Sequence, residues 1–293
     1  MKERIVIQSA RCRAEIAWLG AQLESLKNAE ALEYLWQRDP QWWGGCAPVL
    51  FPMVGALRKG RTVIGGRIYE MPQHGLARRR EFSLLSHTES EAVFSLRADE
   101  LTKKQYPFDF ELQIAYRAEG ASLATVYRVM NRGEVPMPYA VGGHPAFNVP
   151  LCEGERFEDY TVEFEKEETA SCPAIVMGEG LIDPSRMTPR LTGTSVIPLT
   201  HGLFYGDALV FEGLRSKKVT LRGKAGRGLT MDFSSFPMLG VWSAVNDGPF
   251  VALEPWCGCA TRTDENDEFA EKRWMRTLPP GQSEEFCYTV TIF

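Results

Sequence analysis

Leu123-Ala-Thr-Val-Tyr-Arg-Val129 carries the period-two pattern of side chains that predicts a β-strand with one buried face. The same period recurs from end to end of the 293-residue chain. Turn-forming pairs such as Glu119-Gly120, just before the quoted stretch, separate the alternating segments. Further segments of this kind are Arg4–Gln8, Tyr160–Glu165, Lys218–Arg222, Leu229–Phe233 and Phe286–Ile292.

Helical patterns, in contrast, are few and short. Asp99–Gln105 and Asp264–Lys272 each open with an aspartate suited to act as an N-cap. The alternation of helices and strands that is typical of a parallel α/β sheet is absent. We therefore predict an all-β sandwich with a few short helices, built as one domain over residues 1–293.

Composition and charge exclude several classes of protein. A net charge of -5 argues against a nucleic-acid partner, which calls for a basic surface. The chain has no run of about 18 apolar residues, so we predict no membrane span. The seven cysteines have no zinc-type spacing, and the opening Met1–Arg4 leads straight into the first alternating segment rather than into an export signal. These features predict a cytoplasmic protein with reduced thiols, no disulfide and no metal, of undetermined oligomeric state.

Two of the four histidines lie in segments rich in glycine and proline. His74 precedes Gly75, and His144 stands in Gly142-Gly-His-Pro145. Glycine permits unusual backbone angles and proline ends a strand ladder, so each imidazole is expected on a bend, where binding residues often lie. For either histidine alone, the alternative is a hydrogen-bonded structural residue. His87 and His201 are predicted to lie in turns.

Glu254 ends the apolar stretch Phe250–Leu253 and is followed by Pro255-Trp256. A carboxylate among apolar neighbours is partly desolvated, which raises its affinity for a proton. The alternative is a strand-end glutamate that points into solvent. The aromatic residues near these motifs are predicted to be mostly core, with one packed against the apolar face of a sugar: Trp36, Trp42, Trp43, Phe147 and Trp256.

Several segments along the chain form an ordered set of motifs: Leu32–Pro40, Ala47–Gly55, His74–Arg78, Gly142–Leu151, Leu253–Trp256 and Leu278–Gln282. In this order they resemble the aldose 1-epimerase (galactose mutarotase-like) superfamily and are most similar to its LacX-like branch. The segment after Trp256, Cys257–Arg262, departs from the simpler glycine and aspartate pattern expected there.

The resemblance implies a β-supersandwich that interconverts the α and β anomers of an aldohexose without a cofactor. Carried over to this chain, it makes Glu254 the general base on the anomeric hydroxyl. It makes His144 the general acid that protonates the ring oxygen, and it places His74 beside that oxygen. An acid and a base that titrate near neutral pH suit this proton exchange.

The resemblance also suggests residues that contact the sugar. Asp207 is similar to the family's hydroxyl-binding aspartate, and Arg78 and Arg58 are candidates for contacts with sugar oxygens. Phe147 and Trp256 are the aromatic candidates for the substrate site.

Three other functions remain open at this stage. The first is a non-catalytic carbohydrate-binding or sensor protein on the same fold. The second is a hexose-6-phosphate 1-epimerase, which needs arginines for the phosphate; the acidic net charge leads us to expect neutral aldohexoses instead. The third is a metallohydrolase with His74, His144 and Glu254 as ligands, which the lack of a local two-histidine spacing disfavours.

Overall fold

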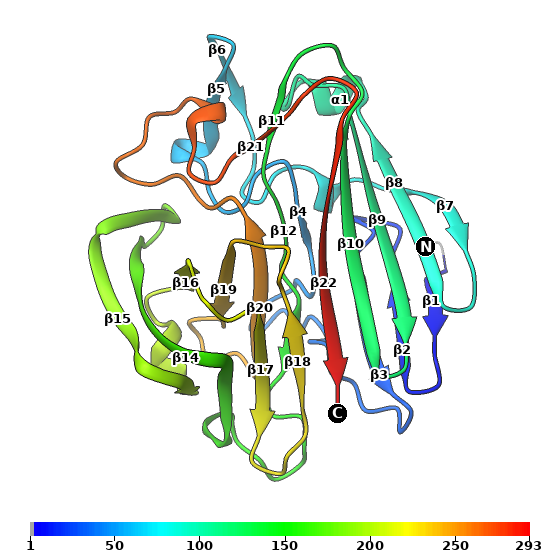
Figure 1. The fold of residues 1–293 in the computed structure, drawn as a ribbon, viewed down its shortest axis with the longest axis vertical. Helices are drawn as coiled ribbons and strands as arrows, with labels where there is room; N and C mark the ends of the chain where they lie inside the picture. The colour runs from blue at the N-terminus through cyan, green and yellow to red at the C-terminus, as the bar shows by residue number, and fades with distance from the viewer. Residues whose placement is uncertain (1–2) are drawn as a thin grey trace.

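Antiparallel sheets pack face to face in the computed structural model, which describes residues 3–293 (Figure 1). The first two residues of the predicted lead-in, Met1 and Lys2, lie outside the described residues. Within the described residues the largest sheet has nine strands and faces a six-stranded sheet across a continuous apolar core. The predicted all-β sandwich is confirmed.

The strand bounds are as follows. The nine-stranded sheet runs in the order β15 (Leu181–Pro198), β14 (Tyr160–Val176), β17 (Lys218–Gly223), β18 (Gly228–Asp232), β22 (Ser283–Ile292), β10 (Ser122–Asn131), β9 (Phe110–Glu119), β8 (Glu91–Arg97) and β7 (Ser83–His87). The six-stranded sheet contains β16 (Leu209–Glu212), β19 (Met238–Trp242), β20 (Phe250–Cys257), β12 (Val141–Gly143) and β4 (Val49–Leu50), with β13 (Ala146–Asn148) also paired to β20. Smaller sheets are formed by β1 (Ile5–Gln8), β2 (Cys12–Ile16) and β3 (Leu23–Asn28), by β5 (Arg61–Ile64) and β6 (Arg67–Glu70), and by β11 (Met137–Tyr139) and β21 (Arg276–Leu278).

The stretch that predicts the fold lies in β10, between β9 and β22 in the larger sheet. Its buried side chains include Leu123, Tyr127 and Val129, all 2% exposed or less. Tyr127 reaches the smaller sheet, where a Cβ on Gly143 would stand 2.9 Å from its hydroxyl oxygen. The glycine therefore lets the two sheets approach closely at β12.

The helical predictions have two outcomes. α1 (Glu100–Lys103) begins after Asp99, whose carboxylate accepts from the Thr102 amide as predicted for an N-cap. The predicted helix over Asp264–Lys272 is wrong except for a single 3₁₀ turn within it, because Arg262 binds the Asp264 carboxylate that was expected to cap it. The remaining helical elements are 3₁₀ turns, and no helix of residues 3–293 has the length and apolarity to cross a membrane. These turns are η1 (Arg58–Gly60), η2 (Ala77–Arg79), η3 (Phe157–Asp159), η4 (His201–Phe204) and η5 (Phe269–Glu271).

β14 and β15 form a long hairpin that curves away from the rest of the larger sheet (Figure 1). Two backbone hydrogen bonds hold its tip: the Ile182 amide donates to the Thr261 carbonyl, and the Thr263 amide donates to the Ile182 carbonyl. This contact brings the hairpin tip against the segment that follows β20. The hairpin therefore reaches the outer face of the smaller sheet, where the cleft described below lies.

Candidate active site

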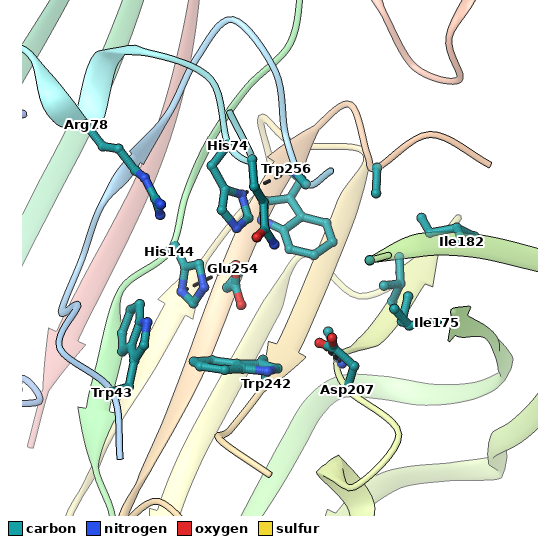
Figure 2. A pocket seen from close by; sticks show the side chains of 16 residues that line it. Trp43, His74, Arg78, His144, Ile175, Ile182, Asp207, Trp242, Glu254 and Trp256 are labelled. Carbon is teal, nitrogen blue, oxygen red and sulfur yellow. Dashed lines mark hydrogen bonds and ion pairs between the residues drawn. The ribbon is translucent and has the colours of Figure 1, made fainter. Parts of the chain in front are cut away.

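A cleft of about 280 Å³ opens on the face of the smaller sheet that points away from the main core (Figure 2). Strand β20 supplies Glu254, and the bend after β12 supplies His144. The loop after β6 adds His74, and the loop before β16 adds Asp207. Residues more than 170 positions apart in the sequence therefore converge on one cavity, as predicted for His74, His144 and Glu254.

Glu254 lies within β20 rather than at its end, which corrects the sequence-based prediction, and it is only 1% exposed. Side chains alternate along the strand, so Leu253 enters the main core while Glu254 and Trp256 face the cleft. Gly240 on β19 is the cross-strand neighbour of Glu254. A Cβ at Gly240 would stand 2.7 Å from the Trp256 indole, so the glycine makes the room that this indole occupies.

Gly240→Ala is therefore expected to displace the Trp256 indole, since no real Cβ contact is that short. We expect a loss of roughly 1–3 kcal/mol in the free energy of unfolding, measured by urea denaturation. Gly202→Ala is the matched control, because its Cβ would have only an ordinary contact at 3.9 Å, with Thr200. Equal stability of the two variants would contradict close packing between β19 and the indole.

His144 is held by its backbone and by three aromatic rings. Its amide donates to Pro48 at 3.2 Å, which ties the bend to the Ala47–Gly55 motif. Trp43 stacks on the imidazole with ring centroids 4.8 Å apart, and Trp242 meets it edge to face at 5.3 Å. His74 is the third ring, at 5.6 Å. The imidazole therefore has little freedom to rotate.

His74 has a left-handed backbone, with φ at 64°, which is costly for a residue with a side chain. Neighbouring hydrogen bonds hold this conformation: its amide donates to the Gly55 carbonyl at 2.9 Å, and its Nδ1 accepts from the Gly55 amide at 3.1 Å. Because Nδ1 is an acceptor, neutral His74 carries its proton on Nε2. Gly75 completes the bend, since a Cβ there would collide with the Phe51 carbonyl at 2.2 Å.

The acid and base candidates are in direct contact. His144 Nδ1 lies 3.4 Å from Glu254 Oε2, and within the described residues neither atom has a hydrogen bond. Burial, followed by the charge of Asp207, raises the pKa of Glu254 well above the ordinary carboxyl range. Burial lowers the pKa of His144 well below the usual histidine range, and nearby His74 and Arg78 add to this shift. These opposite shifts favour the neutral form of the pair, a protonated Glu254 carboxyl and a neutral His144 imidazole.

Among the described residues His74 has no contact with Glu254 of the kind that His144 makes, although burial lowers the pKa of both imidazoles. Burial, and then the charge of Arg78, lowers the pKa of His74 to about 3. The imidazole is therefore neutral at physiological pH, and its Nε2–H is a hydrogen-bond donor rather than a source of protons.

Asp207 and Arg78 line the cleft from opposite ends (Figure 2). Asp207 has a φ of 77°, its amide donates to Phe204, and burial raises the pKa of its carboxyl. Arg78 is half-buried on η2, and burial, followed by the charge of Arg79, lowers its pKa. Trp256 also lines the cleft.

Two predicted substrate contacts lie elsewhere. Arg58 binds Asp267 at 2.7 Å and the Arg262 carbonyl at 2.9 Å, so its guanidinium holds the loop after β20. Phe147 is fully buried, because alternation along β13 points it into the main core beside Leu35. Neither residue lines the cleft, and both assignments are corrected.

The sequence-based prediction missed several residues of the cleft wall. Trp242 lies on β19, two positions beyond Gly240. A glycine inside a strand often marks a place where a ligand or another group approaches the backbone closely, so Gly240 was the one sequence signal that pointed to this wall of the cleft. Ile175 and Ile182 come from the tip of the β14–β15 hairpin, for which no local signal exists. Gln73, next to His74, also lines the cleft.

Donor groups for a metal ion are not clustered. Within residues 3–293 no group of three or more His, Cys, Asp or Glu side chains is arranged to hold an ion. His74, His144 and Glu254 therefore do not form the ligand set that a metallohydrolase would need.

Comparison with known proteins places this geometry in a family. The family model described as "Aldose 1-epimerase" matches residues 3–291. The plasmid-encoded protein LacX of Lactococcus lactis subsp. lactis is 40% identical over 283 residues, which cover 94% of each chain. A galactose mutarotase related enzyme from Lactobacillus acidophilus superposes with a TM-score of 0.94 at 32% identity, covering 99% of this chain and 97% of that one. A galactose mutarotase-like protein from Lactobacillus casei gives a TM-score of 0.92 at 30% identity, with 99% and 100% covered. The chain therefore belongs to the aldose 1-epimerase family and has its galactose mutarotase-like fold.

Proposed function

We propose that the protein is an aldose 1-epimerase that interconverts the α and β anomers of an aldohexose. The observation that carries this proposal is the contact between a buried carboxylate and a buried imidazole, Glu254 and His144, in a cleft with a second, neutral histidine. Such a pair can remove one proton and supply another within the same site. No electrons and no groups other than protons need to be transferred.

The reaction starts from the ionised form of the pair, a Glu254 carboxylate and a His144 imidazolium. The carboxylate takes the proton of the anomeric hydroxyl while the C1–O5 bond breaks. The imidazolium gives its Nε2 proton to O5, because Nδ1 faces Glu254 and only Nε2 is left for the sugar. The products are an open-chain aldehyde with a hydroxyl at C5, a neutral imidazole and a carboxylic acid.

Rotation about C1–C2 then presents the other face of the aldehyde to O5. Closure runs the two proton transfers backwards: O5 returns its proton to His144, and Glu254 returns its proton to O1. Throughout the reaction, His74 donates its Nε2–H toward the ring oxygen and fixes the position of the sugar. Burial of the pair favours its neutral form, which is the form that accompanies the open-chain sugar, so the site stabilises that intermediate.

Anomerisation of freshly dissolved α-D-glucose and α-D-galactose, followed by polarimetry, tests the proposal. We expect the protein to accelerate mutarotation in a saturable manner over the spontaneous rate. Saturable sugar binding without acceleration would instead indicate a carbohydrate-binding or sensor protein. The seven cysteines are free, which supports a reducing compartment such as the cytoplasm as the place of the reaction.

A hexose 6-phosphate is a second candidate substrate, and one observation favours it. Within the described part of the chain, Arg78 and Arg79 form no ion pair and no side-chain hydrogen bond. Both line a shallow recess that adjoins the cleft through Trp43 and contains no carboxylate. If Glu254 lies at O1 and both histidines lie at O5, then C6, which is attached to the C5 beside that oxygen, would extend on the side of the histidines, and Arg78 lines the same cleft. The recess is therefore placed to take a substituent on C6.

The Arg78→Ala variant shows whether the substrate is a free aldohexose or a hexose 6-phosphate. If Arg78 contacts a hydroxyl of a free aldohexose, as we expect, the variant lowers kcat/KM for glucose by about tenfold, the value of one charged hydrogen bond. Glucose 6-phosphate, tested in parallel, should then be no better a substrate than glucose for the wild type. A phosphate ester favoured more than tenfold by the wild type, with the preference lost in Arg78→Ala, would establish the second candidate. Arg61→Ala is the control, since this exposed arginine does not line either cavity.

A further inference from the structure

We propose that Trp43 is a positioning residue for His144: its indole fixes the plane of the imidazole so that Nδ1 faces Glu254 and Nε2 faces the cleft. The two rings are stacked, with centroids 4.8 Å apart and planes 21° from parallel. Trp242 closes the adjacent edge at 87° to the imidazole. A ring held on its face and at its edge cannot turn without displacing a tryptophan.

Trp43 can serve this purpose because it is itself fixed from behind. Its indole packs on Phe250 at 5.7 Å and on Trp242 at 5.2 Å. Gly45 lies against the ring so closely that a Cβ there would stand 2.4 Å from it. The Trp43 carbonyl accepts a hydrogen bond from the Trp36 indole at 2.8 Å. The stacking surface is therefore rigid.

The backbone turn that carries Trp43 is also ordered. The amides of Trp42 and Trp43 donate to the Asp39 carbonyl at 3.1 and 3.0 Å. Asn246, from the turn between β19 and β20, donates to the Gln41 carbonyl at 2.8 Å. The turn thus connects the N-terminal part of the chain to the two strands that carry Trp242 and Glu254.

An indole suits this position better than an aliphatic side chain would. His144 passes through a protonated state during turnover, and it is only 7% exposed. The face of an indole is apolar, yet it attracts a cation. Stacking on Trp43 therefore shields one face of the imidazole from water without opposing its protonation. A leucine would fill part of the space but would neither fix the ring plane nor favour the cation.

The kinetic test rests on the proposed function and uses Trp43→Leu, Trp43→Phe and the neighbouring Trp42→Leu. Trp42 is half-buried on the same turn, but its ring contacts Trp36 rather than His144. We expect Trp43→Leu to lower kcat about 10- to 100-fold, the cost of a misplaced catalytic group, with KM changed less than threefold. Trp43→Phe should recover most of kcat, and Trp42→Leu should retain the wild-type value.

A double variant distinguishes positioning from direct contact with the sugar. Because Trp43 acts through His144, Trp43→Leu should have no further effect on kcat in a His144→Asn background. If Trp43 served only as a platform for the sugar, Trp43→Leu would raise KM in both backgrounds and leave kcat unchanged. That result would overturn the proposal.

A measurement on the substrate-free protein keeps the inference testable apart from the proposed function. The chain has only four histidines, so selective ¹⁵N,¹³C-histidine labelling gives a resolvable set of imidazole NMR signals. Trp43→Leu should shift and broaden the His144 signals, Trp43→Phe should restore a sharp signal, and Trp42→Leu should leave the set unchanged. Unchanged His144 signals in folded Trp43→Leu would refute the positioning role even if the protein is active. If the wild-type protein accelerates the anomerisation of no aldose, but Trp43→Leu still shifts and broadens the His144 signals, only the proposed function is refuted.

Discussion

Glu254→Gln is expected to lower kcat for anomerisation by about 10²–10⁴-fold while KM for the sugar changes little. Glutamine keeps the shape of the side chain and can still form a hydrogen bond, but it cannot take the proton of the anomeric hydroxyl. The rate is best measured by NMR exchange spectroscopy between the α and β signals at equilibrium. Anomerisation at near wild-type rate would mean that a different residue is the base.

The stability of the same variant separates a lost base from a lost fold. Burial raises the pKa of Glu254 in the folded protein above its unfolded value of about 4.3, so the folded state binds this proton more tightly. The contribution of Glu254 to the stability of the wild type therefore falls as pH rises from the pKa of this group in the unfolded state to its pKa in the folded state. Glutamine has no such loss. Glu254→Gln should thus unfold at a higher urea concentration than wild type at pH 8, and the difference should shrink by pH 5.

A variant that is inactive and also more stable would show that Glu254 is kept at the expense of stability, as expected for a functional residue. Glu271→Gln is the control for the charge change, because this glutamate is exposed and remote from the cleft. It should leave the rate unchanged and should not raise the urea midpoint at pH 8. Lower stability of Glu254→Gln at pH 8 would contradict the direction of the pKa shift.

The fold was predictable because its signals are local. Alternation in β10, β17, β18 and β22 reports directly on which side chains face the core, and the Asp99 cap reports on one helical turn. The failure at Asp264 has an equally local cause. An aspartate can satisfy a cap or bind an arginine, and Arg262, two residues away, offers two charged hydrogen bonds to its carboxylate.

Which residues would converge on the cleft was predictable only where the resemblance supplied them. Patterns around His74, His144 and Glu254 left structural alternatives open, and only the family resemblance assigned their roles. Arg58 shows the limit of assigning residue roles from a resemblance. Its side chain is long enough to reach either the cleft or the loop after β20, and the ion pair with Asp267 holds it at the loop. Ile175 and Ile182 could not be found, since they reach the cleft through the curvature of a long hairpin. Such curvature depends on register shifts that residue types do not encode in a readable way.

His144→Asn is expected to lower kcat about as much as Glu254→Gln, because within the described part of the cleft no other imidazole is placed to deliver a proton. His74 cannot replace it, since its Nδ1 is engaged with the Gly55 amide and, among the described residues, only His144 of the two contacts Glu254. NMR exchange spectroscopy again measures the rate. His87→Asn is the matched control: His87 is exposed on β7, and its ring contacts the Val6 carbonyl at 2.8 Å, remote from the cleft.

Combining the two changes tests whether Glu254 and His144 act as one unit. Opening the ring requires that one proton leaves O1 as another reaches O5, so either single change already prevents the coupled exchange. The double variant should therefore be no more than about threefold slower than the slower single variant, rather than slower by the product of both effects. The comparison requires enzyme concentrations high enough for the residual catalysed rate to exceed spontaneous mutarotation. Multiplicative losses would mean that the two residues work in separate steps, and the 3.4 Å contact between them would then have no role in proton exchange.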